Sequence, residues 1–426
     1  MMGLTQVRQD ALNARLAHLG AVSGAFPAAR EMALARVVAQ GLPSRRDEYW
    51  RYTDPASLIA AEPARAPVFD NRAETLAFQA QDRLKLVFTD GVFDPAASDP
   101  LKMAGIEITR LEGAQSGHWA AGYYGTLETA GQTPVARPLA ALNTAFARDG
   151  VLIRVTGKAD KPVSLIYRHF SETSDASLHN VILLEPGSTF TLLENGPAAA
   201  RFSKVTEVIV GDGAQFHHVC VQGRDPERRA VTHIFARLGN ASVFKSFTLT
   251  ANGKLTRNEA VIELHGANAK AHVAGAAVAD GAFHHDDTVF ITHLGRECES
   301  RQVFKKVLMN GATGVFQGKI LVKQSAQKTD GYQIAQSLLM DENSQFLAKP
   351  ELEIYADDVK CSHGSTSGAL DETALFYLRS RGVPDRQAQA LLVLAFLQQA
   401  LDEIEDEAIR ADVGQRMEAW MILHGH

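Results

Sequence analysis

Two potential metal ligands lie close together near the carboxyl-terminal end of the chain, in the run VKCSHG. Val359, Cys361 and His363 alternate with polar residues, and a period of two is typical of a β-strand. Cys361 and His363 should therefore project from one face, roughly 6 to 7 Å apart along the strand. A thiolate and an imidazole suit iron, zinc or a nascent cluster. A closed metal site needs about four ligands, and on the residues alone such a pair is more often structural than ligating.

The strand that carries this pair joins a β-rich body to a helical tail. Upstream, the alternation over 351–356 predicts another half-buried strand, followed by a turn at 357–358. Downstream, residues 364–368 are expected to end the strand. Asp371 should cap a helix that stops at Gly382.

The body from 151 to 359 is dominated by alternating β-branched and apolar residues, interrupted by short polar turns. A β-sandwich would explain the alternation but not a repeat of the turns. A right-handed parallel β-helix explains both, because each coil places a Gly or Asn with positive φ at the same corner. The positions that mark this corner are Gly187, Gly213, Asn240 and Asn268, which are 26, 27 and 28 residues apart.

Helical patterns flank this body on both sides, and we predict a mainly β fold with helical caps. The predicted divisions are an N-terminal helical region and linker (1–83), a small α/β connecting region (84–150), a parallel β-helix core (151–368) and a C-terminal helical domain (369–426). We expect deletion of 370–426 to leave the β-body folded.

The composition is that of an ordinary soluble protein, with 46% apolar and 22% charged residues. A net charge of −6 argues against a nucleic-acid coat. The three cysteines are far apart and odd in number, which implies no disulfide framework and favours a reducing compartment. The amino terminus lacks a signal-peptide core, and no run of 18 apolar residues occurs. We therefore expect a cytoplasmic protein.

The segment RRDEYWRYTD, residues 45–54, is too aromatic for a simple linker. In one interpretation, Trp50 anchors the N-terminal helices onto the next domain, with Arg46 and Arg51 paired to Asp47 or Glu48. In the other, the segment is a docking surface for a partner subunit, to which Tyr52 would also contribute. The residues alone leave both open.

A histidine and aspartate cluster at 284–287 offers a different function. A β-helix enzyme acting on polysaccharide could use His284, Asp286 and Asp287 as acid/base groups. Such enzymes are mostly secreted and carry an aromatic groove, whereas aromatic residues are only 7% here. A corner of solvated polar residues is the commoner explanation, and it applies equally to His217 and His218.

Neither the two remaining cysteines nor any common enzyme motif indicates a catalytic site. Cys220 and Cys298 are expected to be small buried groups. The sequence contains no GxxxxGKS phosphate loop, GxSxG elbow or HExxH helix. We therefore predict that the chain is not an enzyme and does not hydrolyse ATP by itself.

Two motifs in the right order resemble the SufB/SufD family of iron-sulfur cluster assembly proteins. They are RRDEYWRYTD and, roughly 300 residues later, the run 349–382 with KCSHG and FYLRSRG, so the resemblance spans nearly the whole chain. The residues of KCSHG and FYLRSRG are closer to the SufD branch of the family. SufB-like chains usually read more like VEHEA at this point, and carry a further cysteine-bearing segment that this sequence lacks.

The resemblance implies a scaffold that pairs with a SufB-like paralogue, binds a SufC-like ATPase and aids iron acquisition. It implies no cofactor bound stably by this chain alone, but an iron-sulfur cluster held transiently at the interface with SufB. His363 matches the family position at that contact, and Cys361 inherits a weaker version of the same role. A homodimeric scaffold shares the fold and stays open, because an edge that pairs with a related subunit can also pair with itself.

The C-terminal helices should carry the surface for the ATPase. Their apolar residues are more numerous than one small helical cap can hide, and a large exposed patch usually marks an interaction site. The residues predicted to bind the ATPase are Phe376, Tyr377, Leu378, Arg379, Leu391 and Leu394.

Overall fold

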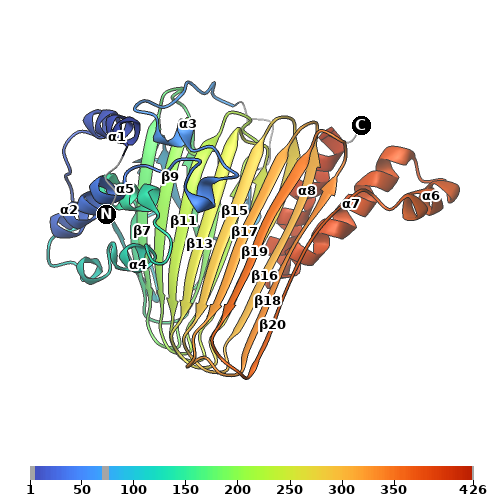
Figure 1. Cartoon of the computed structure of the whole chain (residues 1–426). Helices are drawn as coiled ribbons and strands as arrows, with labels where there is room; N and C mark the ends of the chain where they lie inside the picture. Colours follow the sequence, from blue (N-terminus) through green and yellow to red (C-terminus); the bar gives the residue numbers. More distant parts are fainter. Residues whose placement is uncertain (1–4, 70–75, 425–426) are drawn as a thin grey trace.

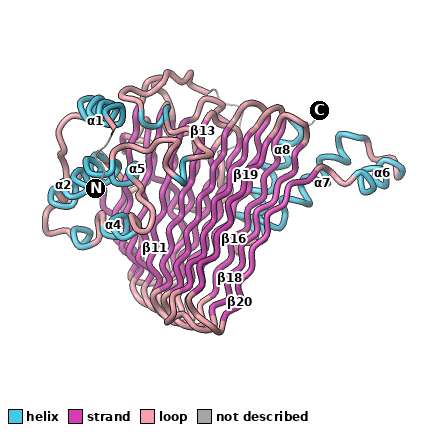
Figure 2. Tube along the Cα trace, viewed as in Figure 1, coloured by secondary structure: helices cyan, strands magenta, loops and turns pink. Residues whose placement is uncertain are grey.

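Two ten-stranded β-sheets face one another in the computed structural model, which describes residues 5–69 and 76–424 (Figure 1). Figure 2 shows the strands running side by side, with helices gathered at both ends of the sheets. This arrangement confirms a mainly β fold flanked by helical segments. Residues 1–4, 70–75 and 425–426, which belong to the predicted terminal regions, lie outside the described residues.

The helices and strands have the following bounds. The helices are α1 Gln6–Leu19, α2 Pro27–Gln40, α3 Ala56–Ile59, α4 Thr126–Ala130, α5 Pro138–Phe146, α6 Glu372–Ser380, α7 Asp385–Leu401 and α8 Glu407–His424. The strands before the repeat are β1 Leu84–Thr89, β2 Val92–Phe93, β3 Lys102–Met103 and β4 Ile106–Arg110. The strands of the repeat are β5 Val151–Val155, β6 Val163–Arg168, β7 Asp175–Leu184, β8 Thr189–Asn195, β9 Arg201–Val210, β10 Gln215–Gln222, β11 Arg229–Leu238, β12 Val243–Ala251, β13 Leu255–Leu264, β14 Lys270–Asp280, β15 His284–His293, β16 Glu299–Met309, β17 Thr313–Val322, β18 Thr329–Leu339, β19 Gln345–Ile354 and β20 Val359–Gly368.

The chain alternates between the two sheets, strand by strand. Sheet A has the order β2-β1-β6-β8-β10-β12-β14-β16-β18-β20, and sheet B has the order β19-β17-β15-β13-β11-β9-β7-β5-β4-β3. Neighbours within the repeat are parallel and two strands apart in the chain, as with β10 and β12 or β11 and β13. Each coil therefore contributes one strand to each sheet, which is the predicted parallel β-helix. The segment 84–150 extends it, with β1 joining sheet A and β4 joining sheet B.

The main hydrophobic core lies between the sheets. Phe190, Phe216 and Phe244 occupy one column of sheet A, with successive ring centroids 6.1 and 5.4 Å apart. Aliphatic side chains of both sheets complete the cluster. Burial of each phenylalanine stabilises the fold by about 1.5–3 kcal/mol, so in-register stacking of like residues holds the coils together.

Helices cover the outer faces of both sheets. Leu12 of α1 and Val37 of α2 share a cluster with Val231 and Leu255 of sheet B. Because the strands are buried on both faces, burial along them is nearly continuous instead of alternating. On sheet A the corresponding cluster joins residues of α7 and α8 to residues of the sheet, namely Val393, Leu397, Met417, Trp420, Val219, Leu249 and Val278.

One corner of the solenoid requires left-handed backbone. Gly187, Gly213 and Asn268 have φ values of 73, 66 and 58° there, as predicted. In the intervening coil the positive φ, 50°, belongs to Ala241 and not to the predicted Asn240. The repeat was therefore placed correctly, but that turn is displaced by one residue.

Asn240 instead forms hydrogen bonds to the neighbouring coils. Its backbone N–H and its side-chain amide both donate to the carboxylate of Asp212, at 2.7 and 3.0 Å. Its side-chain oxygen accepts from the backbone N–H of Ala267 at 2.9 Å. Asn240 thus connects its own coil to the coils before and after it through its side chain.

Acid should destabilise this fold because histidines buried within it, His233 and His293 among them, are held in the uncharged form. Burial lowers the pKa of His233 to about 4 and that of His293 to about 4, whereas histidine in an unfolded chain titrates near 6.5. Between these values only the unfolded chain takes up the proton. The stability present above pH 6.5 is therefore lost as pH falls toward 4, by about 1.4 kcal/mol per pH unit for each histidine.

The measurement is the thermal midpoint of unfolding at pH 7 and at pH 5. We expect the midpoint of the natural protein to fall more steeply than that of the His293→Gln variant, which retains His233 and the other buried histidines but lacks one of the groups that burial keeps uncharged. Equal pH dependence in the two proteins would contradict the prediction.

Candidate metal centre at the open end of the solenoid

The last coil of the solenoid leaves two strand edges free. Among the residues that the structure describes, β19 pairs only with β17, and β20 pairs only with β18. Both sheets therefore end on the same coil, with one row of backbone N–H and C=O groups unpaired on each. Residues 364–368, predicted to end the strand, instead extend β20 to Gly368, because β18 continues beside it as far as Leu338.

His363 occupies an inner position of this last coil. In the register of sheet A, Cys361 lies opposite Gly331 and His363 lies opposite Gln333. Gln333 is fully buried and reaches across the interior to the backbone of Gly318 in sheet B. His363 continues the same column but is exposed, because no further coil covers it.

Cys361 is half-buried on the same strand. It packs at the edge of a small cluster formed by Ile320, Val322 and Ala356. Burial raises the pKa of its thiol, and a hydrogen bond with the backbone of Gly331 opposes that shift. A protonated thiol is a poor ligand, since the thiolate is the form that binds metals. Of the two predicted ligands, His363 is thus the more accessible.

The N-terminal segment 45–54 packs on the outer face of sheet B. Trp50 is 5% exposed, and the Arg257 guanidinium lies 4.1 Å from the centroid of its ring. Arg46 and Arg51 are exposed and Tyr52 is half-buried. The expected pairing of the two arginines with Asp47 or Glu48 does not form, because those carboxylates pair with Arg8 and Lys349 instead.

The same segment also touches the last coil. Tyr49, 302 residues from Glu351, donates its hydroxyl hydrogen to that carboxylate. The Lys349 ammonium lies 4.0 Å from the centroid of the Tyr49 ring and pairs with Glu48. The two motifs of the sequence are therefore in contact across β19. No spacing rule in the sequence could have revealed this.

The histidine and aspartate cluster is not an open acid/base site. Asp286 is fully buried and accepts a hydrogen bond from Thr53, and His284 lies 2.9 Å from the same hydroxyl. Asp287 faces the interior, where it pairs with Lys306. The expectation of a solvated corner is wrong, because the N-terminal segment covers one face of the strand and the solenoid encloses the other.

A second group of potential ligands lies inside the solenoid, where the sequence did not suggest one. Donor atoms of Glu194, His218 and Cys220 lie within 4.8 Å of one another. Lys204 pairs with the Glu194 carboxylate, and Tyr167 donates to it at 2.7 Å. Burial raises the pKa of Cys220 to about 12. The group is thus a neutralised polar part of the core, and His218, expected to be solvated, is buried within it.

The residues predicted to bind the ATPase lie on the C-terminal helices α6 and α7. Helix α6 has no buried residue and projects away from the sheets (Figure 1). Arg379 of α6 pairs with Asp385 of α7 at 3.2 Å. The other predicted residues range from exposed to partly buried: Phe376 (72%), Tyr377 (57%) and Leu391 (45%) are exposed, and Leu378 and Leu394 are partly buried.

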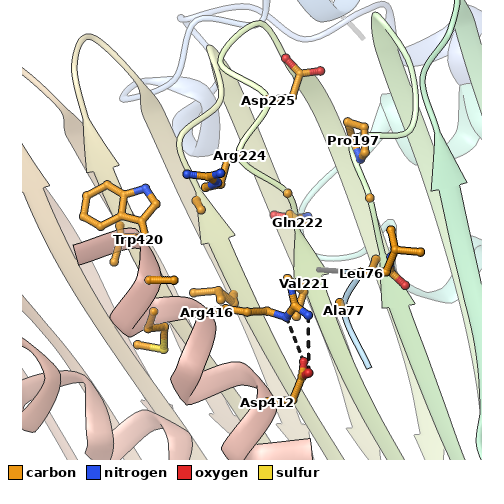
Figure 3. Close-up of a pocket in the computed structure, with 18 of the residues that line it drawn as sticks. Leu76, Ala77, Pro197, Val221, Gln222, Arg224, Asp225, Asp412, Arg416 and Trp420 are labelled. Carbon is orange, nitrogen blue, oxygen red and sulfur yellow. Dashed lines mark hydrogen bonds and ion pairs between the residues drawn. The ribbon is translucent and has the colours of Figure 1, made fainter. Parts of the chain in front are cut away.

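A cavity of about 460 Å³ lies elsewhere, between α8 and the outer face of sheet A (Figure 3). Arg416 and Asp412 of α8 form an ion pair on its wall, with 2.9 Å between Nε and Oδ2. Neither Cys361 nor His363 lines it. The cavity is therefore separate from the candidate metal centre.

None of the helices described is both long and apolar enough to cross a lipid bilayer.

Comparisons with known proteins show the family of this chain. The chain is 29% identical over 399 residues to the iron-sulfur cluster assembly protein SufD of Escherichia coli K12, covering 90% of this chain and 91% of the relative. It is 28% identical over 285 residues to SufD of Bacillus subtilis strain 168, covering 64% of each protein. A SufBD family iron-sulfur cluster assembly protein of Synechocystis is 26% identical over 388 residues, with 85% and 84% covered. Residues 168–396 match the family model for the SufBD core domain of SUF system FeS cluster assembly, and the chain therefore belongs to this family.

Proposed function

We propose that this protein is a non-enzymatic cytoplasmic scaffold subunit of a Suf complex, which pairs with a SufB-like paralogue and contributes to cluster assembly and iron acquisition. The observation that carries the proposal is the last coil, where two unpaired strand edges coincide with an exposed, inward-facing histidine. Free edges of this length are surfaces for strand addition by another chain. A partner with the same coil would extend both sheets and enclose His363.

The iron-sulfur cluster is the cargo of this interface. His363 would supply an imidazole nitrogen as an iron ligand, and Cys361 is the weaker candidate beside it. Because these residues provide at most two ligands, the partner must provide the others. The chain alone would then hold no cluster stably.

The second partner in the proposal is a SufC-like ATPase bound to the C-terminal helices. Phe376 and Tyr377 are largely exposed on a helix that makes no buried contact with the body. Aromatic side chains of this kind are typical anchors of protein interfaces. The ATPase would supply the nucleotide chemistry that the chain lacks.

Affinity purification of the natural protein from its own cytosol, with identification of bound proteins, tests the proposal. We expect a SufB-like paralogue and an ATPase in stable stoichiometric amounts. A chain that purifies only with copies of itself, under the same conditions, would support the homodimeric scaffold and contradict the heteromeric one.

A further inference from the structure

We propose that Gln333 is a positioning residue that holds His363 in a single tautomer, with one ring nitrogen free to bind metal. The inference rests on the proposed ligand role of His363 and adds the residue that orients it. Gln302, Gln333 and His363 lie opposite one another in β16, β18 and β20. Adjacent strands are about 4.8 Å apart, so these side chains form one column that ends at the open coil.

The two glutamines of this column are buried but incompletely hydrogen-bonded. Both are 0% exposed. Neither amide atom of Gln302 has a partner among the described residues, and nor does Oε1 of Gln333. A buried polar group without a partner is unfavourable, because it has lost its hydrogen bonds to water. An acceptor left free next to a predicted ligand therefore points to a hydrogen bond between the two side chains.

Sheet B sets the orientation of the Gln333 amide. Its Nε2 donates to the backbone oxygen of Gly318 at 3.4 Å. A Cβ at position 318 would lie 2.6 Å from Cδ and Nε2 of Gln333, so glycine leaves the room that the amide needs. Because the carbonyl of Gly318 can only accept, the amide nitrogen faces sheet B. The oxygen Oε1 is then available to a donor in its own column.

His363 is the neighbour of Gln333 on the open side of this column. Gln302, on the other side, makes no hydrogen bond to it. A neutral imidazole carries one N–H and one lone pair. Donation of that N–H to Oε1 of Gln333 leaves the second nitrogen unprotonated and directed away from the amide. Metal-ligating histidines are usually oriented in this way by an oxygen acceptor on their second nitrogen.

The test combines histidine tautomer measurement with cluster content. In ¹⁵N-histidine-labelled full-length protein, two-bond ¹H–¹⁵N correlation spectra identify the tautomer of His363, whose signals are assigned by their loss in His363→Gln. We expect one tautomer in the natural protein and a mixture in Gln333→Leu and Gln333→Met. Gln302→Leu, the same change one coil deeper, is the matched control and should leave the tautomer unchanged.

Cluster content gives the second readout. In complexes purified without oxygen, the Gln333 variants should retain roughly one tenth of the natural cluster content, while Gln302→Leu stays near the natural level. A tautomer mixture in the natural protein, or one tautomer in both Gln333 variants, would overturn the positioning role. If Gln333 fixes the tautomer but His363→Ala keeps full cluster content, the positioning contact stands and the proposed ligand role of His363 fails.

Discussion

Replacement of His363 by alanine should leave folding and subunit assembly intact but remove iron-sulfur cluster formation in the assembled complex. His363 is exposed on the uncovered coil, so its truncation should leave the packing of the core unchanged. A cluster shared between subunits needs about four protein ligands, and loss of the most accessible one should prevent its formation. We expect iron and acid-labile sulfide, measured in complexes purified without oxygen, to fall to background.

Cys361→Ala on the same strand is the matched control and should have a milder effect. Its thiol packs beside Ile320 and Val322, and burial raises the pKa of the thiol. Both features favour a protonated packing group over a thiolate ligand. We expect most of the cluster content to remain in this variant. Full cluster content in the His363→Ala complex would refute the proposed role of the histidine.

The double substitution Phe376→Asp/Tyr377→Asp should abolish binding of the SufC-like ATPase. Phe376 and Tyr377 are 72% and 57% exposed on a helix without buried residues, so the substitutions should cost the fold little. Aromatic anchors of an interface each contribute roughly 2 kcal/mol or more. Their loss should therefore lower the affinity at least about 100-fold, measured by calorimetric titration with the purified ATPase.

Val92→Asp provides the control, because Val92 is also exposed (64%) but lies on β2, at the far edge of sheet A. It should bind the ATPase as the natural protein does. Co-purification of the Phe376→Asp/Tyr377→Asp protein with the ATPase at full yield would show that another surface binds it.

Substitution is a sharper test than the truncation that the sequence suggests. Deleting residues 370–426 was expected to leave the β-body folded. However, α7 and α8 bury Val393 and Trp420 against Leu249 and Val278 of sheet A. Their removal would expose an apolar sheet face, so loss of ATPase binding in the truncated protein could reflect aggregation.

The repeat architecture could be predicted because it is written in local patterns. Alternation marks the strands, and turns that recur every 26 to 28 residues require strands that stack in parallel coils. The one misplaced corner, at Asn240, shows where local rules stop. The positive φ of this turn belongs to Ala241, a residue type that rarely adopts it, while Asn240 makes hydrogen bonds to Asp212 in the coil before it.

The burial of the polar residues could not be predicted in the same way. Alternation identifies two faces of a strand but does not say what covers each. Asp286 lies under the N-terminal segment, which is 233 residues away at Thr53, and Asp287 faces Lys306 inside the solenoid. The local polar pattern predicts that both carboxylates are in solvent. No local pattern indicates a contact that distant parts of the chain make.

The sequence by itself determined the β-helix, the helical caps and the placement of Cys361 and His363 on one strand face, because each depends on residue types within a few positions. Only the tertiary structure decided that this strand belongs to an uncovered final coil, that Gln333 stands behind His363, and that Tyr49 reaches β19. Those relations arise from the register between coils and from the position of β19 and β20 as edge strands. They bring together residues that the sequence keeps far apart.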